Sequence, residues 1–257
     1  MKKIGIEQLL TWAFTEELCK LDATGRGVGG YGNHWGAAEV VSELGTLIDR
    51  GPNMYGVIPD IVMNGDPHPD AFIVGDAVRA LDGSVGFEIA VGWNPFPEFS
   101  DDHGLIASEV ENAAMIARLR PESLNGRYMV SLVTTAAILK RGPDWSADEP
   151  SVRMVERQGK PVWFVQAKGK DSFGRAYTFE ADGYDPRRKR PVKGAYRKYE
   201  LCEPLRSEAL SRLDWQLWQD ALCVLHTELD GRLSAFDLLA FAPDRQPWAR
   251  KKAEIFS

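Results

Sequence analysis

Three histidines and one aspartate are the candidate metal ligands of this sequence, since imidazole and carboxylate are suitable ligands. The sequence contains no HExxH pattern and no Cys/His cluster with zinc spacing. Histidine and aspartate beside proline or glycine are also common in turns. We therefore predict no bound metal and keep a metal-dependent hydrolase as a third hypothesis. Its candidate ligands are His34, Asp66, His68 and His103, with Asp70 nearby in the sequence.

The segment Gly25–Gly36, GRGVGGYGNHWG, matches the pattern G-x-G-x-x-G twice, from Gly25 and from Gly27. A dinucleotide fingerprint needs a β-strand immediately before the glycines and a βαβ unit around them. Here the preceding segment is a predicted helix. We interpret the glycines as a flexible connection between two helices. The helix that begins near Ala37 could hold an anion at its free N–H groups.

No pattern of covalent catalysis is present. The chain lacks G-x-S-x-G, and its three cysteines, Cys19, Cys202 and Cys223, have no catalytic or metal-binding spacing. We predict no catalytic residue and no cofactor, and we favour a non-enzymatic protein. The scarce cysteines fit a reducing compartment, and no apolar stretch is long enough for a membrane span. A cytoplasmic protein without membrane contact is expected.

The densest local signal is basic. The segment 185–199 carries seven Lys/Arg within twelve residues, interleaved with tyrosines. Residues 160–200 have a net charge of +6, whereas the whole chain has −6, so the remainder has −12. Arginine and lysine bind phosphates, and tyrosine stacks on bases. On a β-hairpin this segment predicts a DNA or RNA contact made by Arg187, Arg188, Lys189, Arg190, Lys193, Tyr196, Arg197 and Lys198.

Two alternatives to nucleic acid stay open for this hairpin. Its charges could protect strand edges from aggregation as a solvated tip. They could also bind an acidic protein partner. A protein–protein module would have a second anchor in Trp215 and Trp218, which lie three residues apart on one predicted helix. Such tryptophans either pack in the core or serve as exposed anchors for a partner.

The elements that must position these residues change in type along the chain. Apolar residues at helical spacing predict helices over 4–21, 37–48, 70–81, 105–119 and 127–139. Alternating residues predict a strand over 85–91 and further strands over 161–167, 176–181 and 195–201, the last three joined by short turns as an antiparallel meander. A long helix follows from Pro204 to Gly231. A short last helix is predicted to begin near Ser234, because Ser234 and Asp237 have capping-box spacing.

Three short stretches carry a resemblance to a known group. In order they are RGPDW (Arg141–Trp145), GAYRKYEL (Gly194–Leu201) and LDW (Leu213–Trp215). Together they resemble uncharacterised proteins encoded by bacteriophages and prophages. The resemblance covers most of the chain and implies an origin in a mobile element. It favours a small binding or regulatory protein over a metabolic enzyme.

The sequence therefore predicts an α+β protein in two regions. Residues 1–143 form a mainly helical region with Gly/Pro-rich loops, and residues 144–257 form a β-meander with a basic hairpin and a C-terminal helical hairpin. A single compact unit is the alternative. The leading functional hypothesis is a phage-type regulatory protein that contacts nucleic acid through the basic hairpin. The second is a module that binds a host protein or a phage-assembly protein.

Overall fold

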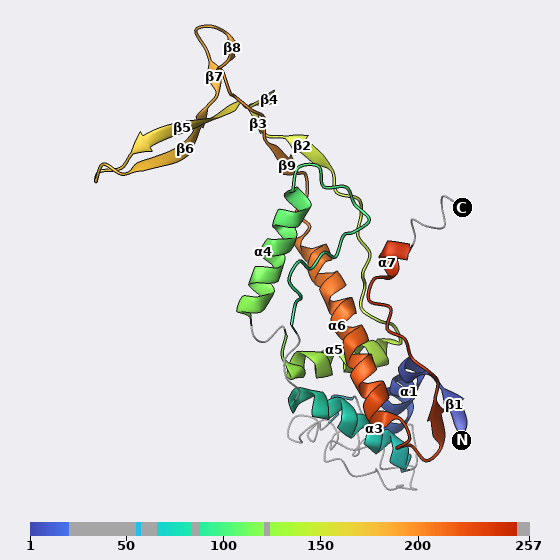
Figure 1. The fold of residues 1–257 in the computed structure, drawn as a ribbon. Coiled ribbons are helices and arrows are strands. Elements are labelled where there is room, and N and C mark those ends of the chain that lie inside the picture. The colour runs from blue at the N-terminus through green and yellow to red at the C-terminus, as the bar shows by residue number, and fades with distance from the viewer. Residues whose placement is uncertain (21–54, 58–65, 84–87, 121–123, 251–257) are drawn as a thin grey trace, which may run out of the picture.

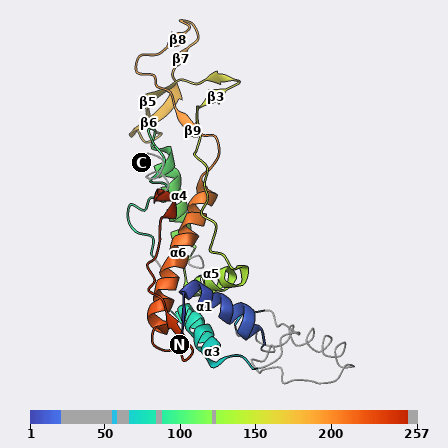
Figure 2. The same ribbon diagram turned by 90° about the vertical axis from the view of Figure 1, so that its right-hand side faces the viewer.

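The structure is a computed structural model that describes residues 1–20, 55–57, 66–83, 88–120 and 124–250. It consists of a helical body from which a β-structured arm extends (Figures 1 and 2). This mixture confirms the predicted α+β class. The Gly25–Gly36 segment, the predicted helix 37–48 and His34 lie outside the described residues.

Helix α6 (Arg206–Leu229) is the centre of the helical body. Its 24 residues give a length of about 36 Å. Of the apolar residues that the helical spacing predicts as one stripe, Leu213, Leu217 and Ala221 are buried, whereas Leu210 is half-buried and Val224 is exposed. Helices α1, α3, α4 and α5 all contact it. No helix in the described ranges is long and apolar enough to cross a membrane.

Four predicted helices surround α6 with nearly their predicted bounds. The first prediction corresponds to α1 (Ile6–Trp12), which continues as a π-helical turn (Ala13–Glu17) and a 3-10 turn (Leu18–Lys20). The others are α3 (Pro69–Ala80), α4 (Leu105–Leu119) and α5 (Gly126–Leu139). The predicted strand over 85–91 is not observed in its described part, residues 88–91.

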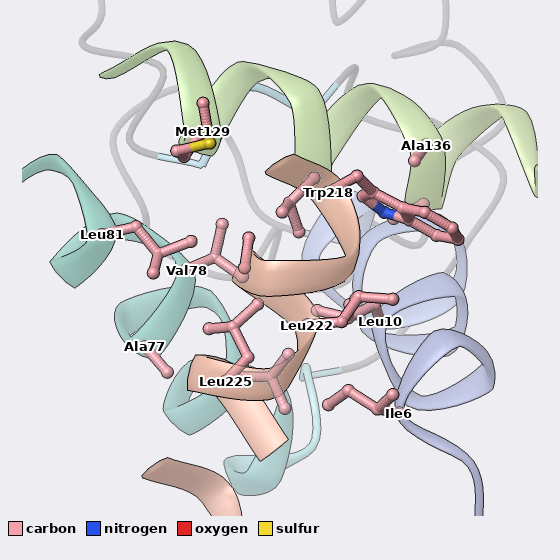
Figure 3. Close-up of a cluster of buried hydrophobic side chains, with 14 of the residues drawn as sticks. Ile6, Leu10, Ala77, Val78, Leu81, Met129, Ala136, Trp218, Leu222 and Leu225 are labelled. Atoms are coloured by element: carbon pink, nitrogen blue, oxygen red, sulfur yellow. The ribbon is translucent and has the colours of Figure 1, made fainter. Parts of the chain in front are cut away.

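One hydrophobic core joins the two predicted regions. Ile6 and Leu10 of α1, Val78 of α3 and Met129 of α5 gather around Leu222 of α6 (Figure 3). All five side chains are nearly inaccessible to solvent. This core therefore contains residues from both sides of the predicted boundary at residue 143.

The end of the chain corrects a prediction. Instead of a helix beginning near Ser234, residues Phe236–Leu238 form β10, which pairs in parallel with β1 (Lys2–Ile4). The buried carboxylate of Asp70 accepts hydrogen bonds from the backbone N–H groups of Ser234 and Ala235. This anchor holds the chain extended beside β1. The C-terminal helical hairpin is therefore reduced to α6 and the single turn α7 (Pro247–Arg250).

The arm, defined here as residues 151–202, contains only β-strands and turns. Its base pairs β2 (Val152–Met154) with β9 (Tyr199–Leu201), and its strands are antiparallel as predicted. They do not form one continuous meander sheet but separate two-stranded ribbons. These are β3–β4 (Glu156–Arg157, Lys160–Pro161), β5–β6 (Phe164–Lys170, Ala176–Asp182) and β7–β8 (Tyr184–Asp185, Arg190–Pro191).

Gly126 allows α5 to start against the short 3-10 turn Leu81–Gly83 (η3) that ends α3. A Cβ atom at Gly126 would clash with the carbonyl oxygen of Leu81 and lie 2.7 Å from Cα of Asp82. We expect Gly126→Ala to lower the free energy of unfolding by about 1–3 kcal/mol, because backbone has to move. Urea denaturation tests this. Gly83→Ala is the control, since its Cβ would meet none of the described residues within 4 Å. Equal midpoints for the two variants would contradict the prediction.

Candidate nucleic-acid interface

The predicted basic hairpin is the β7–β8 ribbon at the outer end of the arm (Figure 1). Tyr184 pairs with Pro191 and Asp185 with Arg190. The carboxylate of Asp185 accepts hydrogen bonds from the backbone N–H groups of Arg187 at 2.9 Å and Arg188 at 3.2 Å. This is the local turn that aspartate favours. It presents the intervening basic side chains to solvent.

Five of the predicted contact residues form what we call the basic tip: Arg187, Arg188, Lys189, Arg190 and Lys193. All five are exposed. Within the described part of the chain, only Arg188 among them has a carboxylate within ion-pair distance, Asp185 at 3.7 Å. An exposed pair at this distance contributes little to stability. The charges of the basic tip are therefore directed toward solvent and are accessible to an anionic ligand.

The other three predicted contact residues make contacts inside the arm. The Arg197 guanidinium lies over the Trp163 ring at 4.1 Å, a favourable cation–π arrangement. Lys198 Nζ lies 2.5 Å from one oxygen of Glu180, and the Tyr196 hydroxyl donates to the other at 2.5 Å. The structure therefore divides the predicted set into two groups. The basic tip is exposed, whereas Tyr196 and Lys198 bind Glu180 and so join β6 to the chain before β9; we call these three residues the clamp.

The clamp changes the titration of its own members. Hydrogen bonds from Lys198 and Tyr196 lower the pKa of Glu180, because they favour its ionised form. The same hydrogen bond to Glu180 raises the pKa of the Tyr196 hydroxyl. Since the pKa of Glu180 is lowered on folding, the clamp contributes stability at neutral pH and loses it as the pH falls through that lowered value.

Positive charge is concentrated on the arm as a whole. Residues 151–202 contain thirteen Lys/Arg and six Asp/Glu, a net charge of +7. The full chain has −6, so the rest of the chain carries −13. The arm projects from the helical body (Figure 1). Repulsion between the acidic part and a polyanion would favour approach at the arm.

The base of the arm contacts the helical body through an aromatic stack and is braced by an ion pair within the arm. The His103 ring, just before α4, stacks on Tyr199 of β9 with centroids 3.9 Å apart and an angle of 7° between the planes. On the same strand, Glu200 accepts from Arg153 of β2 at 2.8 Å. The stack therefore joins the base of the arm to the segment just before α4.

The predicted metal ligands are not brought together in the described part of the chain. His68 caps helix α3 by accepting the backbone N–H of Asp70 at its Nδ1, and its ring packs against Trp12. His103 belongs to the stack at the base of the arm. The residues that the structure describes contain no group of three or more His, Cys, Asp or Glu placed to hold a metal. Asp66 is exposed.

Trp215 and Trp218 pack against each other and against other side chains. Trp218 is buried at 4% exposure. The Trp215 indole N–H donates to the carbonyl of Asp244 at 2.8 Å, and its ring packs edge-on against Trp145. A role in partner binding stays a prediction, and this packing favours the core role for both tryptophans.

The sequence did not single out the aromatic residues of the β5–β6 ribbon as functional. The alternation of Tyr177, Phe179 and Ala181 was visible as a strand signal. The structure adds that this ribbon is solvated on both faces, with Phe173 in its turn 84% exposed. The signal in the sequence that could have identified these residues as functional is the presence of aromatic residues within a basic segment.

Comparisons with known proteins add no functional assignment: no protein-family model, no curated protein and no solved structure matches this chain. The resemblance to phage and prophage proteins is not tested by them and stays a prediction.

Proposed function

We propose that this protein binds nucleic acid through the arm, with the basic tip lying on phosphates. The observation that carries the proposal is the accessibility of these five cations at the end of a projecting ribbon. Arginine binds phosphate oxygens in a forked geometry, and lysine adds point charge. A two-stranded ribbon also fits the width of a major groove. A regulatory role in a phage or prophage would accord with such an activity.

The weak core of the arm supports a role in binding. From residue 138 to 204, a range that the structure describes in full, Gly183 is the only buried residue. Isolated two-stranded ribbons are marginally stable in water. A ligand that covers the arm would bury apolar surface and neutralise charge at the same time.

A protein–protein module is the second candidate, favoured by the same lack of buried side chains in the arm. Its partner would be a host protein or a phage-assembly protein that covers apolar side chains of this chain. Binding that persists in high salt and depends on apolar side chains would distinguish this module from a nucleic-acid binder.

Removing four charges from the basic tip tests the leading proposal. We expect Arg187, Arg188, Lys189 and Arg190, all changed to serine, to weaken binding to both duplex and single-stranded DNA. The slope of log K against log salt should become shallower by about 3, because each phosphate contact contributes about 0.7–0.9. Fluorescence anisotropy across a salt series measures both quantities.

The matched control removes four exposed cations from the helical body, so its net charge equals that of the variant with four serines in the basic tip. It changes Lys2, Lys3, Arg127 and Arg206 to serine. We expect the control to retain most of the wild-type affinity and its salt slope. Equal losses in the two variants would mean that net charge acts without a specific tip. Absence of wild-type binding at low salt would overturn the proposal.

A further inference from the structure

The β5–β6 ribbon has one apolar and one polar face. Across the ribbon Val165 pairs with Ala181, Ala167 with Phe179 and Gly169 with Tyr177, and directly paired residues share a face. We call this the aromatic face. The opposite face carries mainly polar residues, namely Gln166, Lys168, Lys170, Thr178, Glu180 and Asp182, together with Phe164 and Ala176.

The two large rings of the aromatic face, Tyr177 and Phe179, each pair with a small residue on the neighbouring strand. A Cβ atom at Gly169 would be 2.9 Å from the Tyr177 ring, so this ring lies directly over the glycine backbone. Phe179 pairs with Ala167 in the same way along the ribbon. The two ring centroids are 5.6 Å apart, with an angle of 38° between the planes. The side chains therefore form a neighbouring pair of rings on one surface.

This surface is open to solvent. Tyr177 is 51% exposed and Phe179 is 42% exposed. Both belong to a ribbon that contains no buried residue, and the structure describes the whole of it. A contiguous pair of exposed rings of this kind is a candidate interaction surface.

The β5–β6 ribbon also carries cations, two of them on the face opposite the rings. Lys168 and Lys170 lie on β5, and Arg175 lies in the turn where Asp171 accepts the backbone N–H groups of Phe173 and Arg175. None of these three cations has an ion-pair partner among the described residues. Aromatic rings on an element that also carries cations are the combination by which proteins bind single-stranded nucleic acid, with bases stacked on the rings and phosphates held by the charges.

We propose that the aromatic face stacks bases of single-stranded DNA or RNA, so that the arm prefers single strands to duplex. This inference rests on the proposed function, because it assigns the bases to the β5–β6 ribbon and the phosphates to the basic tip and the ribbon cations. Bases in a duplex are already stacked on each other and offer the ribbon no free ring face. An acidic protein would complement the charge but has no specific need for two neighbouring flat rings.

The test uses the full chain and two single-stranded probes: oligothymidine of about 20 nucleotides and an abasic strand of the same length. The variant Tyr177→Leu/Phe179→Leu keeps apolar side chains but removes both rings. We expect it to lose about 30-fold or more in affinity for oligothymidine, corresponding to two lost stacks. Its affinity for the abasic strand and for duplex should stay within about twofold of wild type, because the phosphate contacts remain.

The matched control Tyr177→Phe/Phe179→Tyr keeps both rings and should bind oligothymidine like the wild type. Circular dichroism of the three proteins checks that the leucine variant keeps its fold. The inference is overturned if the wild type binds nucleic acid but the leucine variant keeps full affinity for oligothymidine. It is also overturned if the ring-dependent ligand proves to be a protein or a second copy of the chain. Failure of the wild type to bind any of the three probes would overturn the proposed function itself.

Discussion

Replacing Arg212 with methionine should lower the free energy of unfolding by about 3–5 kcal/mol, as expected when one partner of a buried ion pair is removed. Arg212 lies in the second turn of α6 and is 1% exposed. Its Nη2 lies 2.6 Å from Glu98. Its Nη1 donates to the carbonyl of Pro95 at 2.7 Å and its Nε to that of Trp145 at 3.2 Å.

Stacking adds to these polar contacts. The Arg212 guanidinium lies 4.7 Å from the Phe96 ring centroid and 4.6 Å from that of Trp248. A single side chain thus joins α6 to the segment before α4, to the segment leading to the arm, and to α7. Methionine fills similar volume but leaves Glu98 buried without this cation and removes the donors to two carbonyls.

Urea denaturation followed by circular dichroism measures the effect. The control is Arg232→Met, which removes an exposed arginine paired with Glu228 one turn away; its expected effect is within about 0.5 kcal/mol. Adding Glu98→Gln to Arg212→Met should recover part of the lost stability, because the uncompensated charge is removed. If Arg212→Met unfolded at the same urea midpoint as the wild type, the ion pair would contribute no net stability.

Asp70→Asn should be the second large loss, about 3 kcal/mol, since it disrupts charge-assisted hydrogen bonds to a fully buried carboxylate. One oxygen of Asp70 accepts the backbone N–H of Ser234 at 2.9 Å and its hydroxyl at 2.8 Å. The other accepts the backbone N–H of Ala235 at 2.8 Å. An asparagine has only one carbonyl oxygen, so its NH₂ group would face a donor.

The pH dependence of this effect has a defined sign. Burial by itself raises the pKa of Asp70, but hydrogen bonds from Ala235 and Ser234 lower it by more, so the net shift is downward. A carboxyl group whose pKa is lowered on folding stabilises the protein above the unfolded value of about 3.9. The difference between wild type and Asp70→Asn should be constant from about pH 5 to 7 and shrink below about pH 4.

Denaturation at several pH values provides the measurement, with Asp237→Asn as control. Asp237 lies on β10 but is exposed, so its replacement should change stability by no more than about 0.5 kcal/mol. Hydrogen exchange should also be faster in β1 and β10 of Asp70→Asn, because the anchor that precedes β10 is lost. Unchanged stability at neutral pH would contradict the role given to the carboxylate.

Elements with strong local signals agreed with their predictions. Helix α4 has the predicted bounds, and α6 buries Leu213, Leu217 and Ala221 of the predicted stripe. In both, the spacing of apolar residues determines which side of the helix avoids water, and this requires no knowledge of distant segments. The antiparallel pairing of β5 and β6 follows likewise from a short turn between two strands.

The parallel pairing of β1 with β10 could not be predicted in this way. Lys2 pairs with Phe236, at the opposite end of the sequence. Ser234 and Asp237 have the spacing of a helix start. In the structure, however, the carboxylate of Asp70, far away in the chain, accepts the backbone N–H groups of Ser234 and Ala235. A distant buried carboxylate therefore outweighed the local preference.

For the candidate site, the sequence by itself determined composition and local geometry: a dense basic segment, a turn at Asp185, and the alternation that places Tyr177 and Phe179 on one face. The tertiary structure decided which of these groups are accessible. Lys198 and Tyr196 meet Glu180, and Arg197 meets Trp163, whereas the basic tip and the aromatic face meet solvent. The physical reason is that charge and periodicity belong to the residues and their neighbours in sequence, whereas burial and pairing depend on side chains that only folding brings within contact distance.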